Sequence, residues 1–427
     1  MTDKHNLLKK LVYSGARDKN LIISDMVLDR ISYELAVIKK LSFTDYFILF
    51  SRIIEICNGL NLLRSYGRNS AANSIVNYCL DITKINPIDE NLIFERFINP
   101  KQKHLPDIDI DIPMGYQKSI IELLKQKYPE YYSYYIAFSP QINSDYIDVF
   151  YKNTAYKKHP CGIIITTKKL INSTFLHEEQ EFYIATDGLN DPIFENKFDI
   201  LELDYLNKLQ LIANEIGDKY HPYKLPLNDK QVFNYFTTEN LDDVFQFSAP
   251  SLKHIFAQFK PSSIQDLSII NSMLRPDPID YIQTILDFKL NYNERFHWSD
   301  VRVSEILKET YGFLIYQETF LNLSREIAGL GFSEAEGWRR KIMKDKTKTE
   351  SIAFKSLFVN GCRENSSLKE DEITSLTNLV TDSLPMAFQK AHSLPYSIIG
   401  YWGCYYKLYF RKQFDHAFKS NNKFQLF

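Results

Sequence analysis

Cysteine, glycine and proline are all scarce in this chain of 427 residues. There are 5 Cys, 14 Gly and 16 Pro, too few for a disulfide framework, a collagen-like repeat or a proline-rich disordered tail. The cysteines lie far apart and never form a CxxC pair, which disfavours a cysteine-based zinc site and fits a reducing compartment. With 44% hydrophobic residues, the chain can instead bury the cores of two or three ordinary domains.

Long apolar runs are absent as well. No stretch of about eighteen apolar residues occurs, so we expect no membrane-spanning helix. The first ten residues, MTDKHNLLKK, are charged and lack the apolar centre of a signal peptide. Both features favour a cytoplasmic location.

The charge of the chain is nearly balanced overall but unevenly distributed. The formal net charge is −2. Residues 338–427 contain 15 Lys and Arg against 8 Asp and Glu, whereas the preceding residues contain 36 against 45. The two parts could simply pair with each other, or the basic part could bind a polyanion while the acidic part holds cations.

Hydrophobic periodicity predicts an α+β first half and an α-rich second half. Beyond about residue 206 the pattern is mostly helical, interrupted by turn signals such as RPDP at 275–278. The elements predicted in the first half are helices within 1–64 and at 116–127, and strands at 102–112, 161–170 and 198–206.

The strongest chemical signal is the octamer PDIDIDIP at 106–113. Alternate side chains of a strand share a face, so Asp107, Asp109 and Asp111 are predicted to point one way and the isoleucines the other. Neighbouring carboxylates repel each other unless a divalent cation that prefers oxygen ligands neutralises them. The alternative is a strand whose acidic face is merely solvated. Asp204, in the strand predicted at 198–206, would by itself be an ordinary strand-end aspartate.

These segments belong to a collinear series that resembles the alpha subunit of bacterial DNA polymerase III, the family C replicative polymerases. The series covers roughly residues 25–415. Its closest fragment is LIFERFINPKQKHLPDIDIDIP, similar to the family's LLFERFLNP…PDIDIDF. The other matching fragments are, in chain order, DRISYELAVIKKLSFTDYFILF, YGRNSAANSIVNYCLDITKINPI, KKHPCGIIIT, ILELDYL, VFQFSAPSLKHIF, LRPDP, YGFLIYQETF, WRRKIMKDK and FQKAHSLPYSIIGYWGCYYKLYF.

The resemblance implies a fold and an activity. The fold would be a polymerase-β-like nucleotidyltransferase palm, a mixed sheet with helices, followed by an α-rich fingers domain. The palm with its N-terminal helices would occupy 1–205, with a reduced thumb insertion at about 130–155, and the fingers 206–427. The activity would be that of a DNA-directed DNA polymerase acting on a DNA primer–template and dNTPs with two Mg²⁺ ions, Mn²⁺ being the alternative ion.

The resemblance also implies which residues form the site. Asp107, Asp109 and Asp204 would be the catalytic, metal-binding triad, with Asp111 a flanking acid. Two carboxylates on one strand and a third on a neighbouring strand suit two-metal phosphoryl chemistry. The nucleotide-binding residues would be Arg68, Asn69, Ser70, Arg339, Arg340, Lys344, Lys390 and His392.

Physical chemistry supports the nucleotide-binding residues, but each also has a simpler explanation. A small-residue turn before a helix directs backbone N–H groups toward an anion, and guanidinium pairs bind phosphate bidentately. Without the resemblance, Ser70 would be a helix cap, the basic residues near 340 a solvated helix face, and His392 an ordinary surface histidine.

The sequence departs from the family pattern in four respects. Asn69 and Asn73 replace glycines, and Glu202 stands where a basic residue is usual, which would place negative charge near a tetra-anionic nucleotide. The interval between Asp111 and His159 is short and lacks most of the thumb. The chain begins after the family's phosphoesterase-like domain and ends before its helix-hairpin-helix, clamp-binding and oligonucleotide-binding portions. We therefore expect weak, salt-dependent DNA binding and low processivity.

The terminal KFQLF sequence resembles the peptide with which bacterial polymerases dock on a sliding clamp. A clamp, or a complementing polymerase subunit, is therefore an expected partner, although such a tail can also fold back onto the core. Two other functions stay open. One is a catalytically inactive relative that binds DNA or a protein partner, which Glu202 and the two asparagines favour and the retained acids oppose. The other is template-independent nucleotide transfer.

Overall fold

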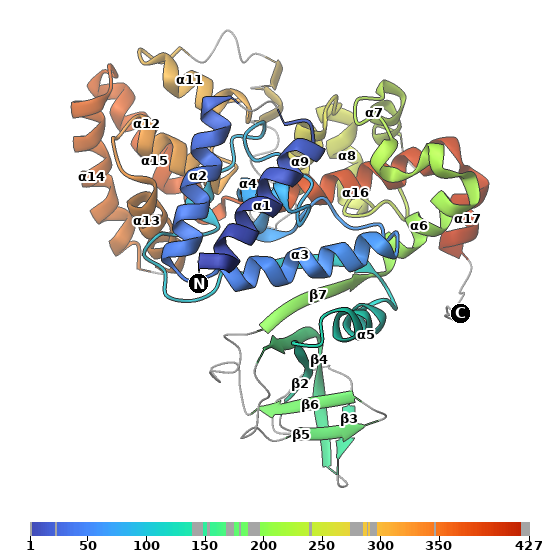
Figure 1. The fold of residues 1–427 in the computed structure, drawn as a ribbon. Coiled ribbons are helices and arrows are strands. Elements are labelled where there is room, and N and C mark those ends of the chain that lie inside the picture. The colour runs from blue at the N-terminus through green and yellow to red at the C-terminus, as the bar shows by residue number, and fades with distance from the viewer. Residues whose placement is uncertain are drawn as a thin grey trace.

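The computed structural model describes most of the chain (Figure 1). The described residues are 2–21, 24–138, 148–151, 154–167, 175–178, 181–186, 197–238, 241–273, 285–287, 289–290, 297–345 and 347–419. The RPDP turn at 275–278 and the KFQLF sequence at 423–427 lie outside them.

Three helices form the N-terminal part, as the periodicity predicted. They are α1 Thr2–Asp18, α2 Asp25–Lys40 and α3 Thr44–Gly59. Each buries an apolar stripe; in α2 the buried face includes Val27, Ile31 and Leu35, at the spacing of an amphipathic helix. The helices lie above the sheet, with α3 nearest to it in Figure 1.

A mixed sheet, seven-stranded over the part of the chain that is described, follows. Its order is β1-β7-β4-β2-β6-β5, with β3 paired to β4. The pairs β1–β7 and β2–β6 are parallel and the other pairs antiparallel. The strands are β1 Asp109–Pro113, β2 Tyr132–Phe138, β3 Asp148–Tyr151, β4 Thr154–Thr166, β5 Phe175–Glu178, β6 Glu181–Thr186 and β7 Lys197–Leu203.

Short elements connect the N-terminal helices to the sheet. The segment after α3 forms η1 Asn69–Asn73, α4 Ile75–Cys79 and η2 Phe94–Arg96. The helix predicted at 116–127 is confirmed as α5 Gln117–Lys127, which packs against α3 and β7. Strands β2 and β3, both paired with β4, lie in the interval expected to hold the reduced thumb.

The boundaries of the three predicted strands were wrong. The strand predicted at 161–170 is β4, which begins at Thr154 and ends at Thr166. Strand β1 begins at Asp109, so Asp107 precedes the strand. Strand β7 ends at Leu203, and Asp204 is the first residue of helix α6. The helix forms because Leu206, Leu209 and Ile212 recur on one face and are buried there, and an acidic first turn interacts favourably with the helix N-terminus.

The rest of the described chain is helical, which makes the fold α+β, with a helix-rich second half. In Figure 1 helices α11 to α15 gather on one side of the molecule, and α6, α7, α8 and α17 on the other, with α16 between them. None of the described helices is long and apolar enough to cross a membrane. The helices are α6 Asp204–Ile216, α7 Lys230–Phe236, α8 Pro250–Phe259, α9 Ile264–Ser272, α11 Val301–Lys308, α12 Gln317–Glu326, α13 Phe332–Lys344, α14 Thr349–Asn365, α15 Glu370–Ser383, α16 Lys390–Tyr409 and α17 Arg411–Lys419.

Three hydrophobic clusters form the interior. The first joins the N-terminal helices to β1 and β7, the second surrounds α16, and the third joins α11 to α15. Leu63 and Ala72 belong to the second cluster and Ile93 to the third. The connecting segment therefore packs against both helical groups, and the division into domains at 205/206 stays a prediction.

Candidate metal centre

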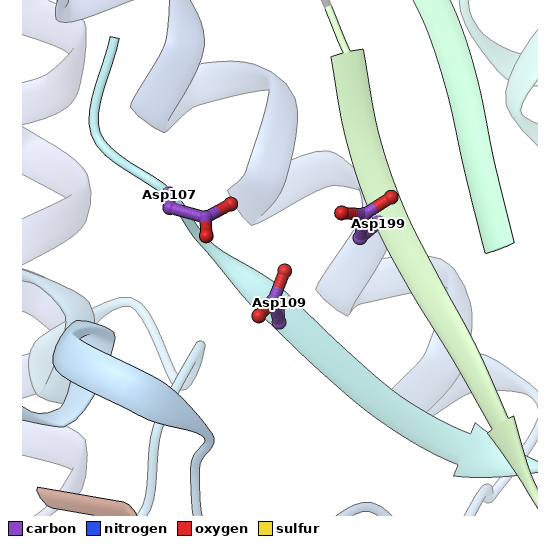
Figure 2. Close-up of side chains that lie close together, drawn as sticks. All are labelled: Asp107, Asp109 and Asp199. Atoms are coloured by element: carbon purple, nitrogen blue, oxygen red, sulfur yellow. The ribbon is translucent and has the colours of Figure 1, made fainter. Parts of the chain in front are cut away.

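Strands β1 and β7 bring together aspartates that are far apart in the sequence. The two strands are parallel, with Asp109 directly opposite Asp199. Ligand oxygens of Asp107, Asp109 and Asp199 all lie within 4.8 Å of one another. Figure 2 shows the three carboxylates facing the same space between the two strands. Carboxylate oxygens at this separation are the ligand set that Mg²⁺ and Mn²⁺ prefer.

Asp199 therefore takes the place that the sequence analysis gave to Asp204. The pairing of Pro113 with Leu203 ends the ladder, so Asp204 lies beyond it on α6. Its carboxylate is nearly half exposed and lies 2.9 Å from the ammonium group of Lys208, one helical turn further along. The expectation that Asp204 joins the cluster was wrong because the register of β1 and β7 places Asp199, and not Asp204, opposite Asp109.

A signal for Asp199 was present in the sequence. Asp199 lies between Phe198 and Ile200 in KFDILEL, and both apolar neighbours are buried. Because alternate side chains of a strand face opposite ways, the aspartate must point away from that apolar face. A carboxylate in the middle of an apolar strand is a better ligand candidate than one at the strand's end.

Asp109 has the environment expected of a cation ligand. Its side chain is only 7% exposed, and its Oδ1 atom has no hydrogen-bond partner among the residues that the structure describes. Burial, followed by the charges of Asp107 and Asp199, raises the pKa of Asp109 to about 7. A bound cation would satisfy the unpaired oxygen and offset the repulsion among the three carboxylates. The residues present therefore fit a divalent metal ion.

The start of η1 and the residue before it contact the cluster directly. Asn69 has φ 50°, a left-handed conformation that asparagine tolerates better than most residues. Its side-chain amide donates a hydrogen bond to Oδ2 of Asp109. The Nε atom of Arg68 lies 3.7 Å from the same oxygen. The glycine-to-asparagine departure thus places an amide against a candidate metal ligand.

Asp111 lies outside the cluster, beneath the same arginine. It is 1% exposed, and Nη1 of Arg68 donates to its Oδ1 over 3.1 Å. The hydroxyl of Tyr396 donates to the same oxygen over 3.3 Å. Arg68 and Tyr396 are themselves hydrogen-bonded. Asp111 therefore anchors Arg68 and links β1 to α16.

His392 and Ser70 lie beside this loop. The backbone N–H of Asn69 donates to Nδ1 of His392 over 3.3 Å, and the His392 ring lies 4.4 Å, centroid to centroid, from that of Tyr396. Ser70 is in η1, where its carbonyl accepts a hydrogen bond from the buried Asn73 side chain. Asn73 also accepts from the backbone of Ile93, so this asparagine stabilises the loop.

The two arginines of α13 converge on one buried carboxylate. Glu336 is fully buried and accepts hydrogen bonds from Arg339 over 2.6 and 2.7 Å and from Arg340 over 2.7 Å. Arg96, in η2, adds a third guanidinium 3.8 Å from Glu336. The buried Glu318 also acts on Arg96, so carboxylates balance part of the positive charge in this region. The role of Arg339 and Arg340 in nucleotide binding stays a prediction.

Lys390 and Lys344 lie in contrasting surroundings. Lys390 is 3% exposed, and its ammonium group lies 2.5 Å from Glu309 and 3.2 Å from Glu90. Lys344 is exposed in the last turn of α13. Because Lys390 is held in buried ion pairs, a nucleotide would have to compete with two carboxylates for it. Nucleotide binding by these lysines likewise stays a prediction.

Glu202 does not place its charge in the cluster, contrary to what the sequence suggested. Its Oε1 atom accepts hydrogen bonds from the backbone N–H groups of Gly115 and Gln117, over 2.8 and 2.9 Å. These N–H groups belong to the start of α5, where a carboxylate is stabilising. Glu202 is three residues from Asp199 and so lies on the other face of β7.

The fold and the site define an α+β protein in which a mixed sheet holds three clustered carboxylates, followed by a helix-rich region. Residues 6–147 match the family described as the bacterial DNA polymerase III alpha NTPase domain. Residues 202–366 match the bacterial DNA polymerase III alpha subunit finger domain. The chain belongs to the bacterial DNA polymerase III alpha family.

Full-length relatives extend the similarity over nearly the whole chain. The chain is 29% identical to DNA polymerase III subunit alpha of Ureaplasma parvum, over 96% of the chain and 49% of the relative. It is 27% identical to that of Mycoplasma pneumoniae, over 91% and 51%, and 26% identical to that of Bacillus subtilis, over 96% and 43%. The chain thus spans about half the length of the curated relatives it matches.

Proposed function

We propose that this chain is the catalytic core of a DNA-templated DNA polymerase that transfers deoxynucleotides to a primer with low processivity. The observation that carries the proposal is the cluster of Asp107, Asp109 and Asp199. Membership of the polymerase III alpha family supplies the substrate class, a DNA primer–template and dNTPs.

The three aspartates would hold two Mg²⁺ ions, or Mn²⁺. Metal ions at such a cluster supply activation of the attacking hydroxyl and neutralisation of charge on the leaving pyrophosphate. Asp109, buried and opposite Asp199, fixes the spacing of the ligands. Arg68 holds Asp111 and lies beside Asp109, so it limits the charge repulsion that the three carboxylates create in the absence of a cation.

The nucleotide would bind on the side of the cluster that is formed by η1 and α16. Asn69 and His392 are already joined there by a hydrogen bond, and Ser70 follows in the same loop. Arg340, half exposed on α13, and the exposed Lys344 would supply positive charge for the triphosphate. Arg339 and Lys390 would contribute only after exchanging their present carboxylate partners.

Primer extension by the full chain tests the proposal. The assay compares a primed template, unprimed single-stranded DNA and a primer without template, with Mg²⁺ or Mn²⁺ and all four dNTPs. We expect template-dependent incorporation, reduced at least about 1,000-fold in Asp107→Asn, since metal ligands carry most of this catalysis. Asp218→Asn, in an exposed ion pair with Lys224, is the matched control and should retain activity. Incorporation that ignores the template would replace the proposal with template-independent transfer.

A second candidate is a catalytically inactive member that binds DNA. Two observations favour it: the Asn69 amide occupies an oxygen of Asp109, and Lys390 is held by Glu90 and Glu309. This candidate predicts salt-dependent binding of primer–template, measured by fluorescence anisotropy, without incorporation under any of the metal conditions.

A further inference from the structure

A cysteine thiol contacts the carboxylate that completes the candidate metal centre. Cys161 is on β4, next to Gly162, which pairs with Asp199 across the β4–β7 ladder. Its Sγ atom lies 3.6 Å from Oδ1 of Asp199, within hydrogen-bonding distance for a thiol donor. Neither the proposed function nor the family match gives this thiol a role.

The position of Cys161 relative to Asp199 is fixed by its surroundings. The side-chain amide of Gln117 donates to the carbonyl of Cys161 over 3.4 Å and to that of Ile200 over 3.0 Å. Gln117 is 8% exposed, and Glu202 holds its backbone N–H. One buried side chain thus joins β4 to β7 beside Asp199, so the thiol and the carboxylate are held together by backbone contacts on both strands.

Cys161 also differs from the other four cysteines. Cys57, Cys79, Cys362 and Cys404 are buried, whereas Cys161 is partly exposed, and no cysteine forms a disulfide. The second feature that points to a ligand here is the unpaired Oδ1 atom of the nine-tenths buried Asp109, the register partner of Asp199. The thiol is therefore accessible to solvent on one side and contacts the candidate metal ligands on the other.

We propose that Cys161 is a positioning residue for Asp199, and that covalent modification of its thiol weakens metal binding at the cluster. The inference rests on the proposed metal-binding role of the three aspartates. The thiol donates to one Asp199 oxygen, which restricts rotation of the carboxylate. Loss of a residue that hydrogen-bonds to a metal ligand commonly lowers metal affinity by about 10- to 100-fold. Because a thiol is a weak donor, we expect a loss of about 10-fold for Cys161.

Modification acts by removing the donor and adding bulk between β4 and Asp199. With iodoacetamide, the thiolate attacks the methylene carbon, a sulfur–carbon bond forms, iodide leaves and the thiol proton passes to solvent. The sulfur of the resulting thioether has no proton to donate, so the donor at the position of the thiol is lost. The group attached to sulfur must then occupy space beside Asp199, which displaces the carboxylate from its position opposite Asp109.

The test is Mn²⁺ binding to the full chain, followed by electron paramagnetic resonance, which does not depend on catalysis. Cys161→Ala should weaken Mn²⁺ binding about 10-fold. Cys161→Ser, which keeps a hydroxyl donor on a shorter bond, should lose less. Thr166→Ala, at the C-terminal end of β4, is the matched control and should bind as the wild type does. Equal affinities in all four proteins would overturn the inference.

Alkylation gives a second, independent measurement. Iodoacetamide should modify Cys161 selectively in the native protein, and saturating Mn²⁺ should slow the reaction, as followed by peptide mass spectrometry. The treated wild type should lose Mn²⁺ affinity, whereas treated Cys161→Ser should not. Modification that leaves affinity unchanged would overturn the inference.

The two proposals fail in different ways. If the wild type binds Mn²⁺ at the cluster but extends no primer, the polymerase proposal fails and the comparison of Cys161 variants alone decides the inference. If the wild type binds no Mn²⁺, the metal role of the aspartates fails, and the inference fails with it.

Discussion

Asp199 lies directly opposite Asp109 in the parallel ladder of β1 and β7. This register joins the last strand before the helix-rich region to the first strand of the sheet, and it completes a cluster that neither strand could form alone. Any change in the pairing of these strands would separate the carboxylates, so the sheet edge and the candidate metal centre are a single structural unit.

The first prediction follows from this pairing. Asp199→Asn should abolish Mn²⁺ binding at the cluster and reduce primer extension at least about 1,000-fold, because it removes one of the three carboxylates that would hold the metal ions. Asp204→Asn should change both by less than about 3-fold, since it loses only a partly exposed ion pair with Lys208. The measurements are Mn²⁺ titration and primer extension. If the two variants exchanged these phenotypes, the cluster would have been assigned to the wrong aspartate.

The second prediction concerns pH and Asp109. The pKa of Asp109 is raised from its ordinary value of 3.8 to about 7, so the native state binds more protons than the unfolded state between these values. The stability of the metal-free protein should therefore fall as the pH rises from about 4 through 7, by up to about 1.4 kcal/mol per pH unit.

Asp109→Asn removes this titration. In EDTA, the variant should gain stability relative to the wild type between pH 5 and pH 8, by on the order of 2 kcal/mol in urea-induced unfolding. The same variant should lose metal binding, so stability and function should change in opposite directions. A wild-type stability that rises over this pH range in parallel with the variant would contradict the assigned pKa.

The third prediction concerns Glu202. If its charge lay close to the cluster, neutralising it would strengthen binding of the anionic nucleotide and weaken binding of the metal cation. The hydrogen bonds to Gly115 and Gln117 predict instead that Glu202→Ala lowers the free energy of unfolding by about 1 kcal/mol, as the loss of a helix cap does. Mn²⁺ affinity should stay as in the wild type, whereas a loss of Mn²⁺ affinity would mean that the Glu202 charge acts on the cluster. Glu215→Ala, at an exposed position of α6, is the control in the same denaturation experiment and should be nearly neutral.

The fourth prediction concerns Glu336. Glu336→Gln should lower the free energy of unfolding by about 3 kcal/mol, because it leaves the buried guanidinium groups of Arg96 and Arg339 without their shared counter-charge. Glu334→Gln, exposed on the same helix, should change stability by less than about 0.5 kcal/mol. Chemical denaturation of the two variants provides the comparison, and equal stabilities would mean that the arginine cluster does not depend on Glu336.

Much of the fold, and part of the candidate metal centre, was predictable from the sequence because these features depend on local patterns. The apolar periodicity of residues 1–64 predicted helices there, and α5 begins within a residue of its predicted start. The alternation in PDIDIDIP predicted that the side chains of Asp107 and Asp109 point to the same side, with the isoleucines on the other side. Both features depend only on neighbours in the chain, where side-chain spacing and hydrogen-bonding period leave few alternatives.

The partner of that aspartate pair was not predictable in the same way. Asp199 lies within β7 and Asp204 follows the strand directly, and the chain changes from strand to helix between them. A single aspartate forms no repeating pattern, so its spacing in the sequence could not show whether Asp199 or Asp204 faces β1. Only the register of two parallel strands distant in the sequence decides it.

The sequence by itself determined the α+β composition, the helical N-terminus and the similarity to polymerase III alpha. It also determined the pairing of Asp107, just before β1, with Asp109, within it. The tertiary structure decided which acid completes the cluster, that Glu202 caps α5, and that Lys390 is held by two glutamates. The physical reason is that backbone conformation follows from neighbouring residues. The partner of a buried charge depends instead on strand register and helix packing, which bring distant residues into a shared environment of low polarity.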